Sequence, residues 1–243
     1  MRVLNTMLPV PILRMLARLR GRTFSPPVGS LRLGDLRRKT PVSRRFGLDR
    51  GLPIDRYYIE GFLARNTRDI QGRVLEIGDS IYTRRYGGHS VTASDVLHVA
   101  EGNPLATFVG DLASANHIPS ETFDCIILTQ TLQYLYDVRA ALATLRRIMK
   151  PGGVLLATFP GITQIPQGHW DNTWYWGFTR LSAQRLFEEA FPGSAVAVET
   201  HGNVLVSIAF LHGLAVNELR QEELDWHDPD YQTLLTVRAV KPR

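Results

Sequence analysis

The sequence predicts an α/β fold, with a mostly parallel β-sheet and helices on both of its faces. Two observations support this prediction. After residue 53, short apolar segments rich in β-branched residues alternate with longer amphipathic segments, which is the pattern of repeated strand–helix units. The clearest short segment, 123–128, is apolar along most of its length, as expected of a strand that helices cover on both sides.

Each predicted element has a local reason. The segment 138–149 predicts an amphipathic helix because Val138, Leu142, Leu145 and Met149 share one face, and Lys150-Pro-Gly-Gly then ends it. The segment 203–214 is ambiguous, with a buried helix as one interpretation. The other expected helices are 54–65 and 181–191. The expected strands are 73–77, 91–94, 107–110, 123–128, 154–159, 195–199 and 234–240.

Size and charge divide the chain into an arm and a domain. The 243 residues suit one large domain with an appendage, and 44% hydrophobic residues is a globular value. Residues 1–50 hold twelve basic and two acidic residues, whereas residues 51–243 hold 16 basic and 21 acidic residues. We therefore expect a basic N-terminal arm at 1–50 and a mildly acidic domain at 51–243.

The arm contains one amphipathic segment, 11–20, which brings Ile12, Leu16 and Leu19 near one helical face among several arginines. Three interpretations remain open: peripheral contact with an anionic membrane, a helix packed on the domain, and a targeting peptide. No aromatic residues interleave the basic pairs at 37–39 and 44–45, so no nucleic-acid partner is expected. The single cysteine, Cys125, lies in an apolar run, and a cytoplasmic location is the simplest expectation.

Three residues at predicted strand ends suggest a nucleotide-type binding site. Gly78 follows the first strand, where it permits a sharp turn and close approach of a ligand. Asp95 ends the second strand 17 residues later, at a spacing suited to ribose hydroxyls. Asp111 ends the third strand, where it could accept a hydrogen bond from an adenine amine while the Leu112 N–H faces the ring.

Four motifs resemble the class I S-adenosylmethionine-dependent methyltransferases: VLEIG at 74–78, SD at 94–95, GDL at 110–112 and the long run at 123–160. The resemblance implies a Rossmann-like, seven-stranded sheet and S-adenosyl-L-methionine as cofactor. It places Glu76 and Gly78 by the methionine part of the cofactor, with Thr129 and Gln130 closing over the sulfonium. The full cofactor-binding set that it implies is Glu76, Gly78, Asp79, Asp95, Asp111, Leu112, Thr129 and Gln130.

A narrower resemblance concerns the segment 41–63 together with GRVLEIGD and YTRRYGG. These stretches are similar to bacterial methyltransferases that are encoded beside glycosyltransferases. The resemblance implies O-methylation of a sugar hydroxyl in a polysaccharide or glycolipid precursor.

The turn after the first strand departs from the family pattern. Ser80 and Tyr82 stand where the family has its second and third glycines. Only about a dozen residues connect Gly78 to the second strand, so the usual first helix is expected to be short or absent, with 82–88 as a loop. The sequence therefore predicts an altered cofactor pocket.

Transfer of a methyl group to a hydroxyl needs a base, and the loop after the fifth strand offers one. His169 is the candidate base and Asp171 the residue that orients it, although a structural histidine in a lid is the alternative. The same loop holds Trp170, Trp174 and Trp176, whose faces suit the C–H faces of sugars or the packing of a lid. No grouping of His, Cys and Asp has metal-ligand spacing, so no metal is expected.

Two other functions remain open at this point. The altered turn leaves a non-catalytic relative, which serves as a binding or assembly subunit, as an alternative. The order of strand, turn and acid is also shared with NAD(P)-dependent oxidoreductases, although Gly-x-Gly-x-x-Gly is missing.

Overall fold

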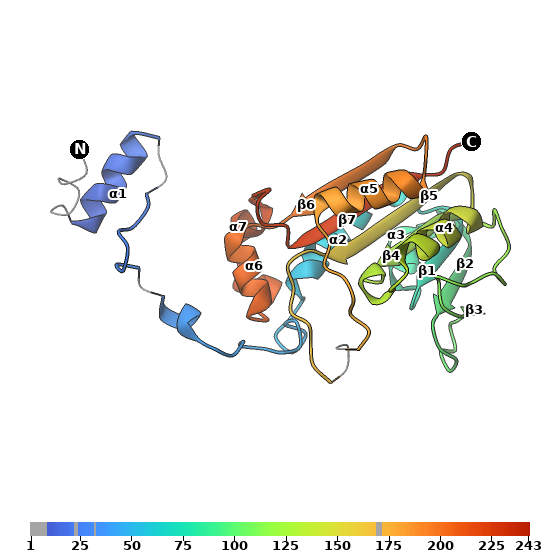
Figure 1. The fold of residues 1–243 in the computed structure, drawn as a ribbon, viewed down its shortest axis with the longest axis horizontal. Helices are drawn as coiled ribbons and strands as arrows, with labels where there is room; N and C mark the ends of the chain where they lie inside the picture. Colours follow the sequence, from blue (N-terminus) through green and yellow to red (C-terminus); the bar gives the residue numbers. More distant parts are fainter. Residues whose placement is uncertain (1–8, 22–23, 32, 169–171) are drawn as a thin grey trace. The chain divides into compact units, whose positions relative to one another are not determined.

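The fold is described by a computed structural model, which covers residues 9–21, 24–31, 33–168 and 172–243 (Figure 1). The chain divides into two compact units, 1–40 and 41–243. The predicted arm therefore ends at residue 40 instead of 50. Residues 41–50 join the larger unit because the N–H groups of Val42 and Ser43 donate to the His212 carbonyl at 2.8 and 3.0 Å.

The smaller unit contains the helix α1 (Val10–Leu19) and the 3₁₀ helix η2 (Gly34–Arg37). The position of α1 confirms the helix predicted at 11–20. Ile12, Met15 and Leu19 follow the helical spacing and are 40%, 56% and 76% exposed. Arg18 lies in the last turn, where a positive charge suits the helix dipole.

The larger unit is built on a seven-stranded sheet in the order β3-β2-β1-β4-β5-β7-β6. The first five strands run parallel, and β7 runs antiparallel to both of its neighbours, which confirms the predicted fold class. The strands are β1 (Gly72–Ile77), β2 (Val91–His98), β3 (Phe108–Val109), β4 (Phe123–Thr129), β5 (Met149–Pro160), β6 (Val196–His201) and β7 (Leu234–Val240).

Three helices of this unit, α4, α5 and α6, begin at residues whose side chains cap them. Asp137 accepts a hydrogen bond from the Ala140 N–H at 2.9 Å and begins α4. Asn203 accepts one from the Val206 N–H at 3.0 Å, which identifies the ambiguous segment 203–214 as a helix followed by a turn. The α-helices are α2 (Ile54–Arg65), α3 (Ile81–Tyr86), α4 (Val138–Ile148), α5 (Arg180–Ala190), α6 (Val204–Leu211) and α7 (Gln221–Asp225). The 3₁₀ helices are η3 (Thr67–Asp69), η4 (Gly88–Ser90), η5 (Leu132–Tyr134) and η6 (Val216–Glu218).

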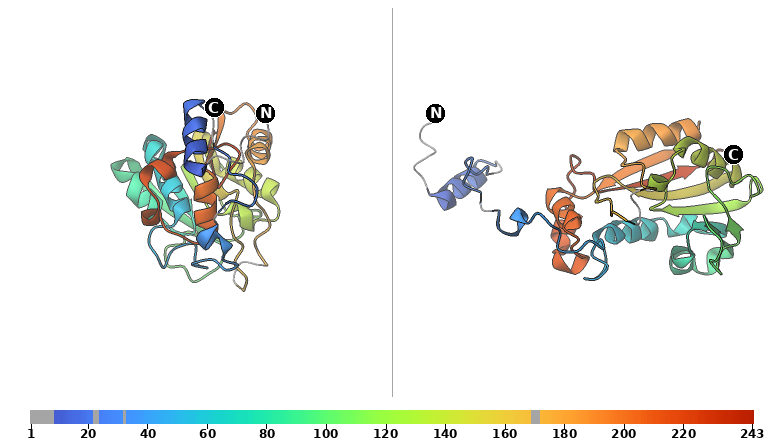
Figure 2. Two further views of the ribbon diagram at one scale, coloured as in Figure 1. Left: turned by 90° about the vertical axis from the view of Figure 1, so that its left-hand side faces the viewer. Right: turned by 60° about the horizontal axis from the view of Figure 1, so that its bottom comes forward.

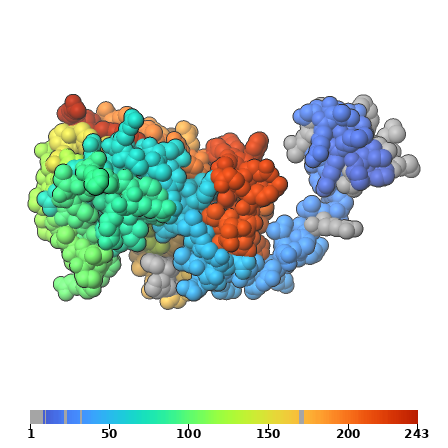
Figure 3. Space-filling view, turned by 180° about the vertical axis from the view of Figure 1, so that it is seen from behind, coloured from blue at the N-terminus to red at the C-terminus, as the bar shows by residue number. Residues whose placement is uncertain are grey.

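Helices cover both faces of the sheet. Figure 2 shows α4 and α5 on one face and α2 and α3 on the other. Successive residues of β4 face two different cores: Ile126 belongs to the core that includes Phe187 of α5, and Ile127 to the core that includes Phe62 of α2. On the second face, α2, α6 and α7 lie side by side, as the cyan and orange-red segments of Figure 3 show.

The strand order places a ligand site at one edge of this sheet. The chain first builds outward from β1 through β2 to β3 and then returns to add β4 on the other side of β1. Ligands of such sheets bind beyond the carboxyl ends of the strands at this reversal. No helix in the described part of the chain is long and apolar enough to cross a membrane.

Candidate active site

The turn after β1 leaves an open space at the reversal point. Gly78 has a φ of +94°, and a Cβ added to it would meet no other atom within 4 Å. Two hydrogen bonds hold the turn: the Gly78 N–H donates to the Leu97 carbonyl, and the Asn103 side chain donates to the Gly78 carbonyl, each at 2.9 Å. A ligand can therefore approach the backbone of this turn closely.

Glu76 fixes the short helix that follows this turn. Its buried carboxylate accepts hydrogen bonds from the N–H groups of Tyr82 and Thr83 at 3.1 and 2.7 Å, and from the Thr83 hydroxyl at 2.7 Å. Burial raises the pKa of Glu76 to about 7, although these hydrogen bonds act in the opposite direction. Both carboxylate oxygens are thus engaged by α3, so Glu76 holds the site's backbone instead of facing the cofactor as expected.

The connection from Gly78 to β2 contains more helix than expected. The sequence predicted a short or absent first helix and a loop at 82–88. The first helix is short, as predicted, but the loop is wrong because α3 occupies Ile81–Tyr86 and η4 follows it. The N–H groups of Tyr82 and Thr83, which have no partner within the first turn of α3, donate to Glu76 instead, which stabilises a helix of six residues.

Asp95 does not end its strand. Strand β2 continues for three residues to His98, because Val96 and Leu97 are both buried. Asp95 pairs in register with Leu75, and its carboxylate binds the Arg73 guanidinium at 2.7 and 3.3 Å. At roughly 3.3 Å per residue, Asp95 lies about 10 Å before the strand end. The prediction that it reaches ribose hydroxyls from the strand end is therefore wrong in position, and half-buried His98 occupies that end.

Three other predicted residues lie beyond the strand ends. Asp79 accepts a hydrogen bond from the Ile81 N–H at 2.8 Å, and Asp111 accepts one from the Ala113 N–H at 2.8 Å. Asp111 is exposed, whereas the side chain of Leu112 is buried in the core. These positions suit a ligand at the sheet edge, and the contacts with adenine stay a prediction.

Thr129 and Gln130 lie at the end of β4, beside the turn of Gly78. Gln130 has a φ of +49°, which side chains seldom adopt and which recurs at functional sites. Its N–H donates to the Thr158 carbonyl at 2.8 Å, and its side-chain oxygen accepts from Gln133 at 3.2 Å. Thr129 pairs with Thr158 across the two strands. The closure of Thr129 and Gln130 over a sulfonium stays a prediction.

A cavity of about 210 Å³ lies at the same edge of the sheet. Four aromatic side chains form much of its wall. The Trp174 ring stacks on Phe46, with centroids 6.5 Å apart, and meets Tyr134 edge to face at 5.1 Å. Phe46 also contacts Phe210 at 6.1 Å. The lining residues are Phe46, Leu48, Pro53, Asp55, Arg56, Gln130, Tyr134, Pro160, Trp174, Phe210, Thr233 and Leu234.

Two charged residues in this wall were missed by the sequence analysis. Asp55 and Arg56 stand in the first turn of α2, where an acid is usually interpreted as complementing the helix dipole. Arg56 donates a hydrogen bond to the Tyr82 hydroxyl at 2.6 Å. Burial raises the pKa of the Asp55 carboxyl, against the opposing effect of the Arg56 charge. No spacing in the sequence indicates that α2 begins beside β4, so the pattern offered no signal for this site.

The predicted base and its orienting residue, His169 and Asp171, lie outside the described residues. The residues that follow this segment lie beside the cavity. The N–H groups of Tyr175 and Trp176 donate to the Gln133 carbonyl at 2.8 and 3.3 Å. These bonds attach the aromatic segment to the loop after β4, and its contact with an acceptor stays a prediction.

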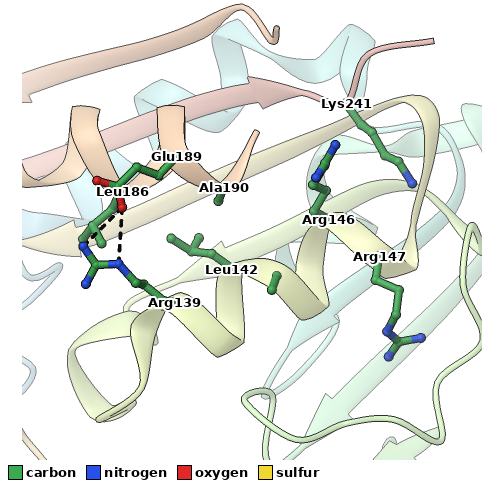
Figure 4. A pocket seen from close by; sticks show the side chains of 9 residues that line it. Arg139, Leu142, Arg146, Arg147, Leu186, Glu189, Ala190 and Lys241 are labelled. Atoms are coloured by element: carbon green, nitrogen blue, oxygen red, sulfur yellow. Dashed lines mark hydrogen bonds and ion pairs between the residues drawn. The ribbon is translucent and has the colours of Figure 1, made fainter. Parts of the chain in front are cut away.

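A second hollow, of about 470 Å³, lies between α4 and α5 (Figure 4). Three of the cationic side chains that line this hollow already interact with other groups of the protein. Arg139 pairs with Glu189 at 3.2 Å, Arg147 donates to two backbone carbonyls, and Lys241 donates to the Met149 carbonyl at 2.8 Å. Met149 begins β5 and Lys241 follows β7, so this end of the hollow lies at the opposite edge of the sheet from the cavity. No group of three or more metal-ligating side chains occurs among the residues described.

Comparison with known families identifies the domain. The sequence model of a family described as methyltransferase domain matches residues 78–157. This range begins at the turn glycine and ends within β5. Of the residues that line the cavity it includes Gln130 and Tyr134. This part of the chain is similar to a methyltransferase domain. No curated protein sequence matches the chain.

Solved structures share the fold of this chain. An S-adenosylmethionine-dependent methyltransferase from Mesorhizobium loti is 18% identical, with a TM-score of 0.54 over 80% of this chain and 100% of that chain. Phosphoethanolamine N-methyltransferase 2 from Haemonchus contortus, solved with S-adenosyl-L-methionine, is 15% identical, with a TM-score of 0.52. That match covers 76% of this chain and 53% of the H. contortus enzyme, so the chain spans about half of its length.

The described residues fit the cofactor that the family match implies. The space above Gly78 accommodates a ligand, and Arg56 supplies a cation near the same turn for an anionic group. Two buried side-chain atoms close to Gln130, Gln133 Oε1 and Thr158 Oγ1, have no hydrogen-bond partner among the described residues, so a ligand or water would satisfy them. The prediction of S-adenosyl-L-methionine as cofactor agrees with the family and with neighbours solved with it, and the NAD(P)-dependent alternative is set aside.

Proposed function

We propose that this methyltransferase transfers a methyl group from S-adenosyl-L-methionine to a sugar hydroxyl of a polysaccharide or glycolipid precursor. The aromatic cavity beside Gln130 is the observation that supports it most. Aromatic rings combine a broad apolar face with polar edges, which suits a ring-shaped acceptor that carries both C–H faces and hydroxyl groups. The carboxylate of Asp55 in the same wall adds an acceptor for hydroxyl protons.

The residues of the protein mainly align the acceptor with the methyl donor, whereas the donor itself supplies the reactivity. Bound S-adenosyl-L-methionine supplies an electrophilic methyl group on a sulfonium. The protein has to hold the acceptor oxygen in line with that group and keep competing water out. Gly78 and the α3 backbone form one side of this arrangement, and the rings of Trp174 and Tyr134 form the other.

A direct assay tests this proposal. The purified full-length protein would be incubated with labelled S-adenosyl-L-methionine and a panel of saccharides, lipid-linked sugars and phosphoethanolamine. We expect label on a sugar oxygen, assigned by mass spectrometry of the product. Label on the amine alone would overturn O-methylation. Tight S-adenosylhomocysteine binding without any turnover would favour the alternative of a non-catalytic binding subunit.

Replacing Trp174 by Ala tests the cavity as the acceptor site. Loss of the stacking face is expected to raise KM for the saccharide about 2- to 12-fold, since aromatic contacts contribute about 0.5–1.5 kcal/mol beyond burial. The Kd of S-adenosylhomocysteine should stay unchanged. Trp226→Ala is the control, because Trp226 is 70% exposed and outside the cavity. An unchanged KM in Trp174→Ala would argue against this location.

We also propose that α1 lies on an anionic membrane surface, because it presents exposed apolar residues beside Arg14 and Arg18 and has no acid in its first turn. The full chain is expected to float with phosphatidylglycerol vesicles but not with neutral phosphatidylcholine vesicles. Met15→Glu should abolish flotation, whereas Leu31→Glu, at a residue 60% exposed outside the helix, should not. Equal flotation of both variants would contradict the proposal.

A further inference from the structure

The Asp55 carboxylate has unused hydrogen-bonding capacity inside the acceptor cavity. It lies in the wall of the cavity and is half-buried. The hydrogen bond it accepts comes from the backbone N–H of Arg56 at 2.9 Å. No Lys, Arg or His of the described chain lies within ion-pair distance of it. An ionised carboxylate has about four lone-pair positions, so most of its capacity remains available to a ligand.

The surroundings of Asp55 favour a proton acceptor. Arg56 is the nearest cation on its own helix, but its guanidinium donates to the Tyr82 hydroxyl and lies 5.9 Å from the centre of the Tyr82 ring. The other titratable groups that face Asp55 are Tyr82 from α3 and Tyr134 from η5. Burial raises the pKa of both phenols, so both stay neutral at physiological pH and leave the charge balance to Asp55 and Arg56.

We propose that Asp55 is the catalytic base that accepts the proton of the sugar hydroxyl during methyl transfer; this inference rests on the function proposed above. The hydroxyl oxygen forms a bond to the methyl carbon while the sulfur–carbon bond of the donor breaks. The sulfur keeps that electron pair and becomes a thioether, and the hydroxyl proton passes to a carboxylate oxygen of Asp55. Every atom and charge is then accounted for without a metal or a further reactant.

The charge of Asp55 does not stabilise the folded protein. Burial disfavours the ionised form, so the folded protein tolerates this carboxylate at some cost in stability. An asparagine would keep the side-chain oxygen that accepts the Arg56 N–H and would remove the charge. Asp55→Asn is therefore expected to fold at least as well as the wild type, which separates a lost base from a lost fold.

The test compares Asp55→Asn with the wild type on the saccharide that the panel identifies. We expect kcat to fall about 100- to 10,000-fold, the usual range for removal of a general base. KM, the Kd of S-adenosylhomocysteine and Tm should stay close to wild type or, for Tm, rise. Asp230→Asn, at an exposed acid outside the cavity, is the matched control and should retain full activity.

A pH profile and parallel variants complete the test. Wild-type kcat should decrease tenfold per pH unit on the acidic side, because protonated Asp55 cannot accept a proton, and this limb should vanish in Asp55→Asn. His169→Ala and Asp171→Asn are measured alongside. Asp55→Asn that retains kcat, with His169→Ala losing it, would overturn this inference and leave the proposed function intact. A wild-type protein that methylates no saccharide would overturn both.

Discussion

Replacing Glu76 by Ala is expected to lower the free energy of unfolding by about 3 kcal/mol and to abolish measurable binding of S-adenosylhomocysteine. The substitution removes the acceptor of three hydrogen bonds inside the protein and leaves buried donors of Tyr82 and Thr83 without a partner. Without these bonds α3 loses its first turn, and the backbone beside Gly78 loses its shape. Urea denaturation and isothermal calorimetry measure the two effects.

Glu101→Ala is the control for this prediction, because Glu101 is exposed in the turn after β2. It should leave both quantities near the wild-type values. Glu76→Gln keeps one acceptor oxygen and should lie between the wild type and Glu76→Ala. Normal S-adenosylhomocysteine affinity in Glu76→Ala would show that α3 does not shape the cofactor site.

The same residue gives the stability a defined pH dependence. Burial raises the pKa of Glu76 from its ordinary 4.5 to about 7, so within this window the folded protein holds a proton that the unfolded chain has lost. Stability then decreases as pH rises across the window. The difference in unfolding free energy between the wild type and Glu76→Gln should therefore shrink from acid to neutral pH.

Replacing Gly78 by Ala is expected to weaken S-adenosylhomocysteine binding at least tenfold while the protein remains folded. The added methyl group enters the open space that a ligand requires. The φ of +94° also strains any residue with a Cβ, at a cost of about 1–2 kcal/mol. Calorimetry gives the affinity, and thermal denaturation gives the loss of stability.

Gly193→Ala provides a matched control. Gly193 has a φ of +77°, and a Cβ there would meet its nearest atom, in Pro242, at 3.9 Å. It lies in the turn between α5 and β6, away from the cofactor edge. We expect a similar loss of stability with normal ligand binding. Equal affinities in the two variants would mean that the space above Gly78 does not hold the cofactor.

The regular elements were predictable because their causes are local. The helix predicted at 54–65 coincides with α2, and the strand predicted at 123–128 differs from β4 by one residue. The strand follows from an apolar run that is buried along most of its length, and α2 begins directly after Pro53 with Asp55 in its first turn. The predicted arm ended too late because the contact of Val42 and Ser43 with His212 joins segments far apart in the sequence.

Asp95 shows where local reasoning fails. An acid after a short apolar strand was interpreted as the strand's end, because charged residues rarely enter a parallel sheet. Arg73 on the neighbouring strand neutralises it at 2.7 Å, so the strand continues through Asp95 to His98. That partner lies 22 residues earlier in the chain, beyond the reach of any pattern within the strand.

The sequence by itself determined the fold class, because this follows from the order and spacing of strands and turns. Its motifs also resemble a methyltransferase family, and that resemblance implied the cofactor. Only the tertiary structure decided how the site is built. In the folded protein Glu76 accepts hydrogen bonds from α3, and Asp95 pairs with Arg73 inside the sheet instead of lying at its edge. Asp55 and Trp174 line the same cavity. Such groupings depend on how the elements pack against one another, and charge, burial and distance in a site arise only from that packing.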